Sequence, residues 1–361
     1  MIEIGSFVKP SIKSEIVYSA KDYIIKTDKG SFYDTMSGLW CTPLGYSDSG
    51  LKNTITNQLH ILPYYNNYFE TQCDITERYA KNLCNATKMD RVYFSLSGAG
   101  AVETAIKVAH NNRPTGKCCV FKKSYHGATI LSGYTSDYNL ENYHKLKSPI
   151  EVHYYEDEMD LNEMSFVLLE PVICAGGIHK HDNKVWENLS KYQKNGGIII
   201  LDEIVTGFGK TGKLFAKEWT PINPDIVLLG KAITNGYIPF AATLINENIL
   251  STKSFEHGFT CSGHPLGSAA GEYVLQKLLK YDFNFKEYEL DNHTQVGCMG
   301  AFQFNSIKES TKYKKEMKKL GWILEYSSSD LTRIVYCLPY ILPNDIKEKF
   351  YNDSKLQIAR I

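Results

Sequence analysis

Two polar side chains follow apolar runs at positions where they could act together. The run Ile198–Leu201 ends at Asp202, and the run Ile226–Leu229 leads through Gly230 to Lys231. Short apolar runs of this kind are typical of buried parallel strands, so both side chains are expected at the same edge of a sheet. A lysine there can condense with an aldehyde, and a carboxylate can hold a pyridine nitrogen protonated so that the ring accepts electrons. The pair predicts a pyridoxal 5'-phosphate site.

Each of these two residues also has an ordinary structural explanation. Lys231 fits a surface position in a strand-to-helix loop, and Asp202 fits a helix cap or an ion pair. However, an unpaired carboxylate at the end of a buried strand is costly, and a pyridinium partner removes that cost. Together the two residues favour Schiff-base chemistry, in which the freed amine of Lys231 later moves protons between carbon atoms.

The composition excludes several classes of partner. Forty basic residues balance forty acidic ones, so no long-range field favours nucleic acid or an anionic membrane. No signal peptide and no membrane-spanning run is visible, and we expect a cytoplasmic protein without membrane contact. Nine scattered cysteines without a Cys-x-x-Cys pair indicate reduced thiols, and the His179-x-His181 pair lacks a third ligand, so no metal site is expected.

The pattern of apolar runs predicts an α/β fold. Short continuous strands separated by helices indicate a mostly parallel sheet that is covered on both faces, with ligands beyond the carboxyl ends of the strands. Helices are predicted at Ala101–His110 and Val185–Lys194. The predicted strands are Val92–Phe94, Cys118–Phe121, Phe166–Leu169, Ile198–Leu201, Ile226–Leu229 and Phe240–Ile245.

The two ends of the chain are predicted to meet in a second, smaller lobe. At 361 residues the chain exceeds the usual size of a single domain. We expect residues 1–36 and 274–361 to form the small domain and residues 37–273 the large one. The expected elements of the small domain are a hairpin over 16–32 that turns at 28–30, a helix over 306–320, a strand over 333–338 and a closing helix after Pro343.

Small residues open the helix that follows the first strand of the sheet. Ser97, Gly98 and Ala99 would let backbone amides approach a phosphate, and the helix N-terminus adds a favourable dipole. The alternative is ordinary helix capping by Ser97. A dinucleotide fingerprint is not met, because Glu103 occupies the position of its third glycine.

Further candidates lie after the other strands. Tyr125, followed by His126, could stack its ring on a planar cofactor, although a packed core edge explains it as well. Ile204 and Val205 are candidates for the opposite face of the ring. Thr260 offers a hydroxyl to a phosphate, which alone would carry no meaning.

These motifs together resemble the class III, omega-type, pyridoxal phosphate-dependent aminotransferases of fold type I. The matching segments follow one another in the order that the family has. They are Ser37–Trp40, Ser97–Gly98 with 101–105, 125–127, 170–172, the run from Leu201 to Gly212, Pro224–Ile226 ahead of Lys231, and Thr260 with 263–265.

The resemblance implies a large domain around a seven-stranded-type, mostly parallel sheet. It also implies that Lys231 bears the cofactor, Asp202 binds the pyridine nitrogen and Tyr125 stacks on the ring. A homodimer is implied, in which Thr260 reaches the phosphate of the neighbouring subunit. The positions predicted to contact the cofactor are Ser97, Gly98, Ala99, Tyr125, His126, Glu170, Asp202, Ile204, Val205, Lys231 and Thr260.

The predicted substrate pocket departs from the commonest pattern of the family. Trp40, together with Ile173 where some relatives have glutamine, resembles the omega-amine branch. Many relatives have an arginine that pairs with a substrate carboxylate where this chain reads Ile323–Tyr326, and the first arginine here is Arg333. With Trp40, Ile173 and Arg333 as the expected pocket residues, we predict an amine, ketone or aldehyde substrate, or one bound to a carrier, in preference to an ordinary keto acid.

Other reactions would use the same lysine and aspartate. The predicted reaction is a ping-pong transfer of an amino group between an amino donor and a ketone, aldehyde or keto-acid acceptor. An aminomutase, a racemase or a decarboxylating transaminase would need the same two residues. A catalytically silent scaffold subunit ranks lower, because Lys231 and Asp202 are both present.

Overall fold

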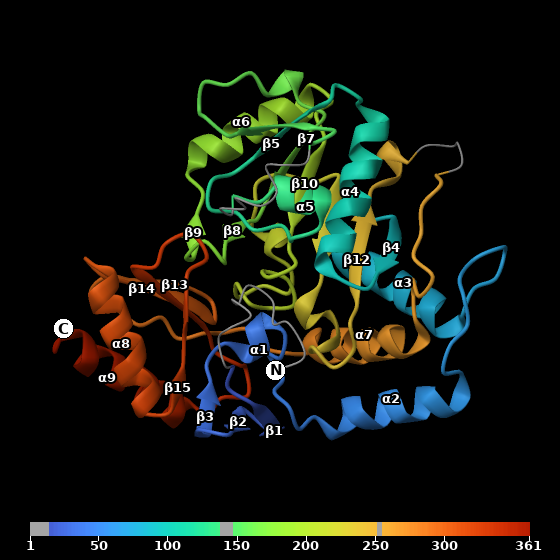
Figure 1. Ribbon diagram of the computed structural model, residues 1–361. Helices are drawn as coiled ribbons and strands as arrows, with labels where there is room; N and C mark the ends of the chain where they lie inside the picture. The colour runs from blue at the N-terminus through green and yellow to red at the C-terminus, as the bar shows by residue number, and fades with distance from the viewer. Residues whose placement is uncertain (1–13, 138–146, 251–254) are drawn as a thin grey trace.

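The computed structural model describes residues 14–137, 147–250 and 255–361. A seven-stranded sheet forms its centre, with strand order β4-β12-β11-β10-β7-β5-β6 (Figure 1). Only β12 runs antiparallel to its neighbours, which confirms the mostly parallel α/β sheet. The strands are β4 (Arg91–Ser95), β5 (Lys117–Val120), β6 (Glu151–Tyr154), β7 (Phe166–Leu169), β10 (Ile199–Asp202), β11 (Ile226–Leu229) and β12 (Ala241–Ile245).

The six predicted strands are all present, and β6 is the one that the apolar pattern missed. This edge strand carries Glu151 and Tyr154 exposed and only partly buries the residues between them. An edge strand has one neighbour and less cover, so it does not need a continuous apolar run.

Helices cover both faces of this sheet, as predicted. Alternate residues of one strand point to opposite faces of the sheet. Ile200 of β10 therefore belongs to the same buried apolar cluster as residues of helix α4 (Gly98–Asn112). Its neighbours Ile199 and Leu201 belong to the buried apolar cluster on the other face, which includes residues of helix α6 (Asn183–Lys194). Burial on both faces is the reason why these strands read as unbroken apolar runs.

Three more helices extend the large domain on one side. Helices α2 (Ser49–Ile61) and α3 (Asp74–Thr87) both pack against α7 (Pro265–Leu278) (Figure 1). The short elements of this domain are α1 (Ser37–Trp40), α5 (Ile130–Tyr134), β8 (Val172–Ile173) and β9 (His179–Lys180).

The two ends of the chain share one small sheet. Strand β15 (Trp322–Ile323) pairs in parallel with β3 (Gly30–Asp34), so the orange-red end of the chain lies beside the blue end in Figure 1. The predicted hairpin, helix, strand and closing helix are confirmed, whereas the exact domain boundaries stay a prediction, and residues 1–13 lie outside the described residues. The remaining elements are β1 (Val17–Lys21), β2 (Ile24–Thr27), β13 (His293–Val296), β14 (Met299–Gln303), β16 (Glu325–Tyr326), β17 (Arg333–Cys337), α8 (Ile307–Lys319) and α9 (Asn344–Ile358).

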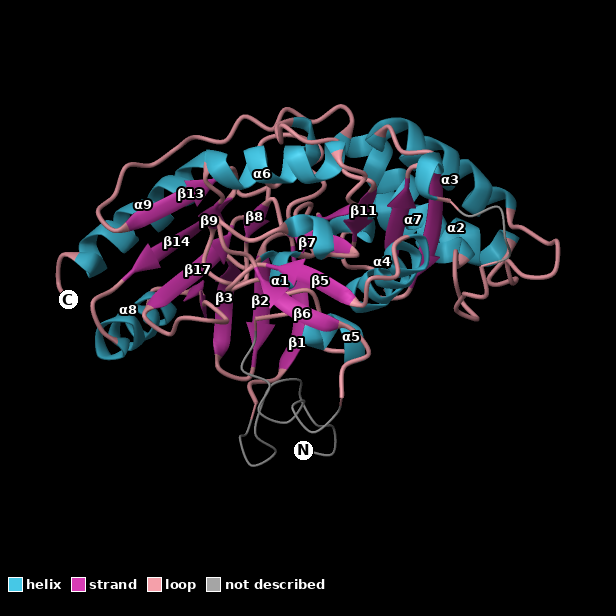
Figure 2. Ribbon diagram, turned by 90° about the horizontal axis from the view of Figure 1, so that it is seen from above, coloured by secondary structure: helices cyan, strands magenta, loops and turns pink. Residues whose placement is uncertain are grey.

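Viewed from above, the second small sheet, with β13, β14 and β17, lies to the left of the large sheet, on the side of the C-terminus (Figure 2). Among the described residues, no helix combines the length and the apolar character that crossing a bilayer would require.

Candidate active site

The parallel strands of the large sheet all end at one edge, and three of the predicted site residues lie there. Glu170 directly follows β7, Asp202 is the last residue of β10, and Lys231 lies two residues past β11. Asp202 is paired in register with Leu228 of the neighbouring strand, which places the start of the Lys231 loop beside it. The sheet therefore brings together residues that are far apart in the sequence.

Asp202 and His126 form a buried pair at this edge. Their closest atoms, His126 Nδ1 and Asp202 Oδ2, are 2.7 Å apart, and both side chains are almost fully inaccessible. The other carboxylate oxygen of Asp202 accepts a hydrogen bond from the backbone N–H of Ile204 at 3.0 Å. His126 Nε2 has no hydrogen-bond partner among the described residues, which is unusual for a buried polar atom. A carboxylate oriented in this way is suited to a cationic ring nitrogen.

Glu170 ties two loops of the site together. Its carboxylate accepts hydrogen bonds from the backbone N–H groups of Tyr125 and Cys174, each at 3.0 Å. Complete burial, helped by the charge of Asp202, raises the pKa of Glu170 to about 7, although the nearby His126 acts in the opposite direction. Glu170 thus holds the residue predicted to stack on the cofactor and the residue that follows Ile173.

Glycines make room at the start of helix α4. A Cβ atom at Gly98 would lie 3.0 Å from Ile204 Cδ1, and one at Gly230 would lie 3.2 Å from Ile204 Cγ2. Ile204 is therefore packed close to both glycines, with the buried Val205 beside it in the chain. The Ser97 side chain accepts from the backbone N–H of Gly100 at 3.1 Å, so the capping function expected as the alternative is present.

Lys231 stands in a strained loop. It has a φ of 44°, a left-handed conformation that a residue with a Cβ atom rarely adopts and that is common at functional sites. Its half-buried side chain places Nζ 5.7 Å from the centroid of the Trp40 ring. The structure thus brings together Lys231 and Trp40, which are 191 positions apart in the sequence.

Arg333 is already engaged within the protein. Its Nε donates to the carbonyl oxygen of Gly177 at 2.5 Å and its Nη1 to Gln303 Oε1 at 3.1 Å, while Nη2 donates to the Thr294 hydroxyl. All three guanidinium nitrogens have partners, so a free clamp for a carboxylate is not formed by this side chain in the structure. Ile173 is buried in β8.

Thr260 and Ala99 occupy accessible positions. The backbone carbonyl of the exposed Thr260 accepts a hydrogen bond from the Tyr64 hydroxyl at 2.8 Å, in the segment that leads into α7. Ala99 is partly buried in the first turn of α4 and contacts the position where Gly127 would carry a Cβ atom.

Two buried ionisable residues near the site, Lys210 and Glu203, were not among the predicted site residues. Lys210 is fully buried, and its Nζ donates to the Gly207 carbonyl at 3.3 Å; burial lowers its pKa. Glu203 accepts from the backbone N–H groups of Ala216 and Lys217, and burial raises its pKa to about 7. The local pattern offered no signal for Lys210, since a lysine in a glycine-rich turn is normally exposed.

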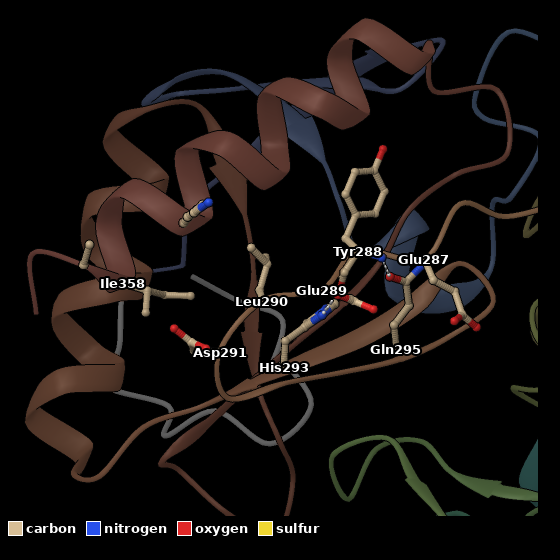
Figure 3. Close-up of a pocket in the computed structure, with 10 residues that line it drawn as sticks. Glu287, Tyr288, Glu289, Leu290, Asp291, His293, Gln295 and Ile358 are labelled. Atoms are coloured by element: carbon tan, nitrogen blue, oxygen red, sulfur yellow. Dashed lines mark hydrogen bonds between the residues drawn. The ribbon is translucent and has the colours of Figure 1, made fainter.

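A separate groove of about 820 Å³ lies in the C-terminal part of the small domain (Figure 3). Three carboxylates line it. Both ring nitrogens of its histidine already have hydrogen-bond partners, His293 Nδ1 with the Tyr288 carbonyl oxygen at 3.0 Å and Nε2 with the Tyr336 hydroxyl at 2.7 Å. None of the predicted site residues is among those that line it. The lining residues are Glu287, Tyr288, Glu289, Leu290, Asp291, His293, Gln295, Lys355, Ile358 and Ala359.

Comparison with known protein families agrees with this arrangement. The family model "Aminotransferase class-III" matches residues 11–333. The chain belongs to the class III aminotransferases. It is 28% identical over 392 residues to an uncharacterized aminotransferase of Sinorhizobium fredii, covering 90% of this chain and 84% of that one. It is 31% identical over 305 residues to the mitochondrial gamma-aminobutyrate transaminase 1 of Oryza sativa, covering 72% of this chain and 59% of that protein.

Solved structures of similar fold include transaminases. The PMP-bound aminotransferase of Vibrio fluvialis superposes with a TM-score of 0.86 at 21% identity, covering 99% of this chain and 96% of that one. The omega-aminotransferase of Paracoccus denitrificans gives a TM-score of 0.86 at 20% identity, with the same coverage. The fold is therefore fold type I, as predicted.

As a class III aminotransferase, the protein is an enzyme whose cofactor is pyridoxal 5'-phosphate. The residues present fit that group. A carboxylate with a bonded imidazole, an accessible lysine amine and a glycine-lined helix N-terminus lie at one sheet edge, and the unpartnered His126 Nε2 is the kind of atom that a bound group would satisfy. When bound, the cofactor would supply the electron sink, and the chain would supply the amine of Lys231 and the carboxylate of Asp202 to hold it.

Proposed function

We propose that this transaminase moves an amino group from an amine donor to a ketone or aldehyde acceptor in two half-reactions. The observation that supports the proposal is the placement of Lys231 and the His126–Asp202 pair at the ends of the adjacent strands β10 and β11. Lys231 would hold the cofactor through its amine, and that amine is the group that would move a proton at the substrate carbon. Asp202 would bind the ring nitrogen of the cofactor, and Tyr125 would hold one face of its ring.

The engagement of Arg333 supports a substrate without a carboxylate at the reacting end. Its guanidinium hydrogen bonds are made to Gly177, Gln303 and Thr294. The loop that precedes it carries serines, of which Ser328 donates through its backbone to Ala175 and Ser329 through its hydroxyl to the Gly176 carbonyl. With the Arg333 guanidinium engaged, an amine-type, ketone or carrier-bound acceptor suits the site better than a keto acid, whose carboxylate would need a cationic partner.

We also propose a homodimer in which Thr260 binds the phosphate held by the other subunit. The exposed position of Thr260 supports this, because its side chain is available to a second chain. Exposed large apolar side chains are frequent in the neighbouring segments, with Phe69 92% and Ile61 78% exposed. Apolar side chains exposed to this degree are often covered by a partner.

We propose that the enzyme functions in a reducing, cytoplasmic environment. The nine free cysteines support this, because such an environment keeps thiols reduced.

A half-reaction assay tests the proposed function. The holoenzyme is mixed with a panel of amines and amino acids, and the loss of the visible absorbance of the lysine-bound cofactor is followed. We expect simple amines to abolish this absorbance. We expect ketones or aldehydes to restore it faster than keto acids do. Equally rapid return with simple keto acids would contradict the substrate assignment.

A labelled donor separates transfer from the related reactions. With a donor that carries ¹⁵N, a transaminase places the label in a second molecule. An aminomutase or a racemase leaves the label in the original carbon skeleton, and a scaffold subunit gives no labelled product.

A further inference from the structure

The short element α1, which ends at Trp40, is a turn with an unusual backbone. Ser37, Gly38, Leu39 and Trp40 have φ angles of 47°, 56°, 63° and 66°, all in the left-handed region. Glycine tolerates this region, but in the three other residues the Cβ atom crowds the following carbonyl oxygen. Such a turn persists only where the surrounding structure determines it strongly. The Leu39 side chain is 62% exposed, so its packing does not provide that support.

The buried carboxylate of Asp34 supplies the support from one side. Its Oδ1 accepts from the backbone N–H of Met36 at 3.0 Å, and its Oδ2 accepts from the backbone N–H of Gly38 at 2.6 Å. The Tyr46 hydroxyl donates to the same Oδ2 at 2.5 Å. Burial, reinforced by the charge of Asp34, raises the pKa of Tyr46 well above its usual value, so this hydroxyl remains a donor.

Contacts around the turn leave little freedom. A Cβ atom at Gly38 would lie 2.9 Å from the Tyr46 hydroxyl oxygen, so Tyr46 is in close contact with the turn as well as bonded to Asp34. The Ser37 hydroxyl donates to the Cys337 carbonyl oxygen at 2.8 Å. The Ser37 carbonyl oxygen accepts from the backbone N–H of Cys41 at 2.7 Å. The turn is thus held at its start by β17 and along its length by Asp34 and Tyr46.

Trp40 is the residue whose position these bonds decide. Its ring lies with its centroid 5.7 Å from Lys231 Nζ, and its side chain is only 4% exposed. Its indole Nε1 is buried without an acceptor among the described residues. A ring beside the reactive amine limits the size of the group that the substrate can place there, and a small rotation of the turn would change that limit.

We propose that Asp34 and Tyr46 are positioning residues that clamp the left-handed turn and thereby, through Trp40, set the size of the amine that the enzyme accepts. The proposal deepens the proposed function and rests on it for its consequence. Its structural part, that the clamp holds Trp40, can be tested on the protein without any substrate.

The first experiment measures specificity. The variants Tyr46→Phe and Asp34→Asn are compared with Tyr237→Phe, a matched control in which another tyrosine hydroxyl loses its bond, at 3.3 Å, to the nearby Gly45 carbonyl. For each holoenzyme, kcat and KM are determined for isopropylamine and for 1-(2-naphthyl)ethylamine. We expect the kcat/KM ratio of the large to the small donor to rise about tenfold in the two clamp variants, mainly through KM, because one charge-assisted hydrogen bond is lost.

A double-variant comparison shows whether the effect passes through Trp40. Trp40→Ala alone should raise the ratio, and adding Tyr46→Phe to it should change the ratio no further. Two results would overturn the proposal. One is an equal loss of kcat/KM for both donors in the clamp variants, and the other is a change in the ratio on adding Tyr46→Phe to Trp40→Ala that is as large as in the wild-type background.

The second experiment is independent of activity. The emission of Trp40 is obtained as the difference between each protein and its Trp40→Phe counterpart, and its quenching by acrylamide is measured with and without cofactor. We expect quenching to increase in Tyr46→Phe and Asp34→Asn and to stay unchanged in Tyr237→Phe. Unchanged quenching in the clamp variants would refute the clamp. If the wild-type protein takes no amine while quenching rises as expected, the proposed function fails and the clamp stands.

Discussion

Two buried glutamates should make the stability of the protein fall as the pH rises. Burial raises the pKa of both Glu170 and Glu203 to about 7 from an ordinary value of 4.5. Below the ordinary pKa of 4.5, each carboxyl is protonated in both the folded and the unfolded chain. Between the two values only the folded chain keeps the proton, so the free energy of unfolding decreases with rising pH, and above about pH 7 the loss is complete.

The size of the effect follows from these pKa values. A difference from 4.5 to about 7 corresponds to about 3 kcal/mol for each carboxyl, at roughly 1.4 kcal/mol per pH unit. Glu170→Gln or Glu203→Gln removes a titrating group and should remove that part of the pH dependence. The amide in each variant keeps only one acceptor oxygen, so one of the two backbone N–H groups loses its partner, a penalty of about 1–3 kcal/mol that lowers stability at every pH.

Urea unfolding of the cofactor-free protein, followed by circular dichroism from about pH 5 to about pH 8, measures this dependence. The difference between variant and wild type isolates one carboxyl from all other titrating groups. Part of the effect already lies below pH 5, so we expect the decrease in the free energy of unfolding over this range to shrink by about 2.5 kcal/mol in each single variant and by twice that in the double variant. Variant and wild-type curves that run parallel would refute the reasoning, because they would show that both carboxyls ionise normally when buried.

Three further predictions concern the site. Lys231→Ala should abolish both turnover and the visible absorbance of the lysine-bound cofactor, as measured by spectrophotometry, and full activity would refute the role of this amine. Asp202→Asn should reduce kcat by about a hundredfold or more while the fold, checked by circular dichroism, is kept; an unchanged kcat would mean that the ring nitrogen has another partner. Gly98→Val should weaken cofactor binding, measured by fluorescence titration, because a Cβ atom there already lies 3.0 Å from Ile204 Cδ1; unchanged affinity would show that Ile204 yields freely.

Much of the sheet and its chemistry could be predicted from the sequence because the signals are local. Strands β10 and β11 are buried on both faces, so each reads as a continuous apolar run that ends in one polar residue. Parallel strands end at one edge, and this places Asp202 and Lys231 together without knowledge of any contact. Strand β6 escaped because an edge strand with exposed residues carries no such run.

The partners of the site residues depend on contacts between distant segments. His126 meets Asp202 across 76 positions, and no local pattern indicates which polar side chain will face a buried carboxylate. Arg333 was expected in the substrate pocket, but the structure bonds its guanidinium to Gly177, Gln303 and Thr294 from three other segments. A long side chain can reach several partners, and only the packed fold selects among them.

The sequence by itself predicted the succession of strands and helices along the chain and the family, and it singled out Asp202 and Lys231 as the candidates for the chemistry, because the burial of each short segment gives it a recognisable apolar pattern. Only the tertiary structure decided how Trp40 stands over Lys231, since a left-handed turn of ordinary residues is unfavourable on its own. That turn exists because the buried carboxylate of Asp34 and the Tyr46 hydroxyl stabilise it, and neither leaves a mark in the residues from Ser37 to Trp40.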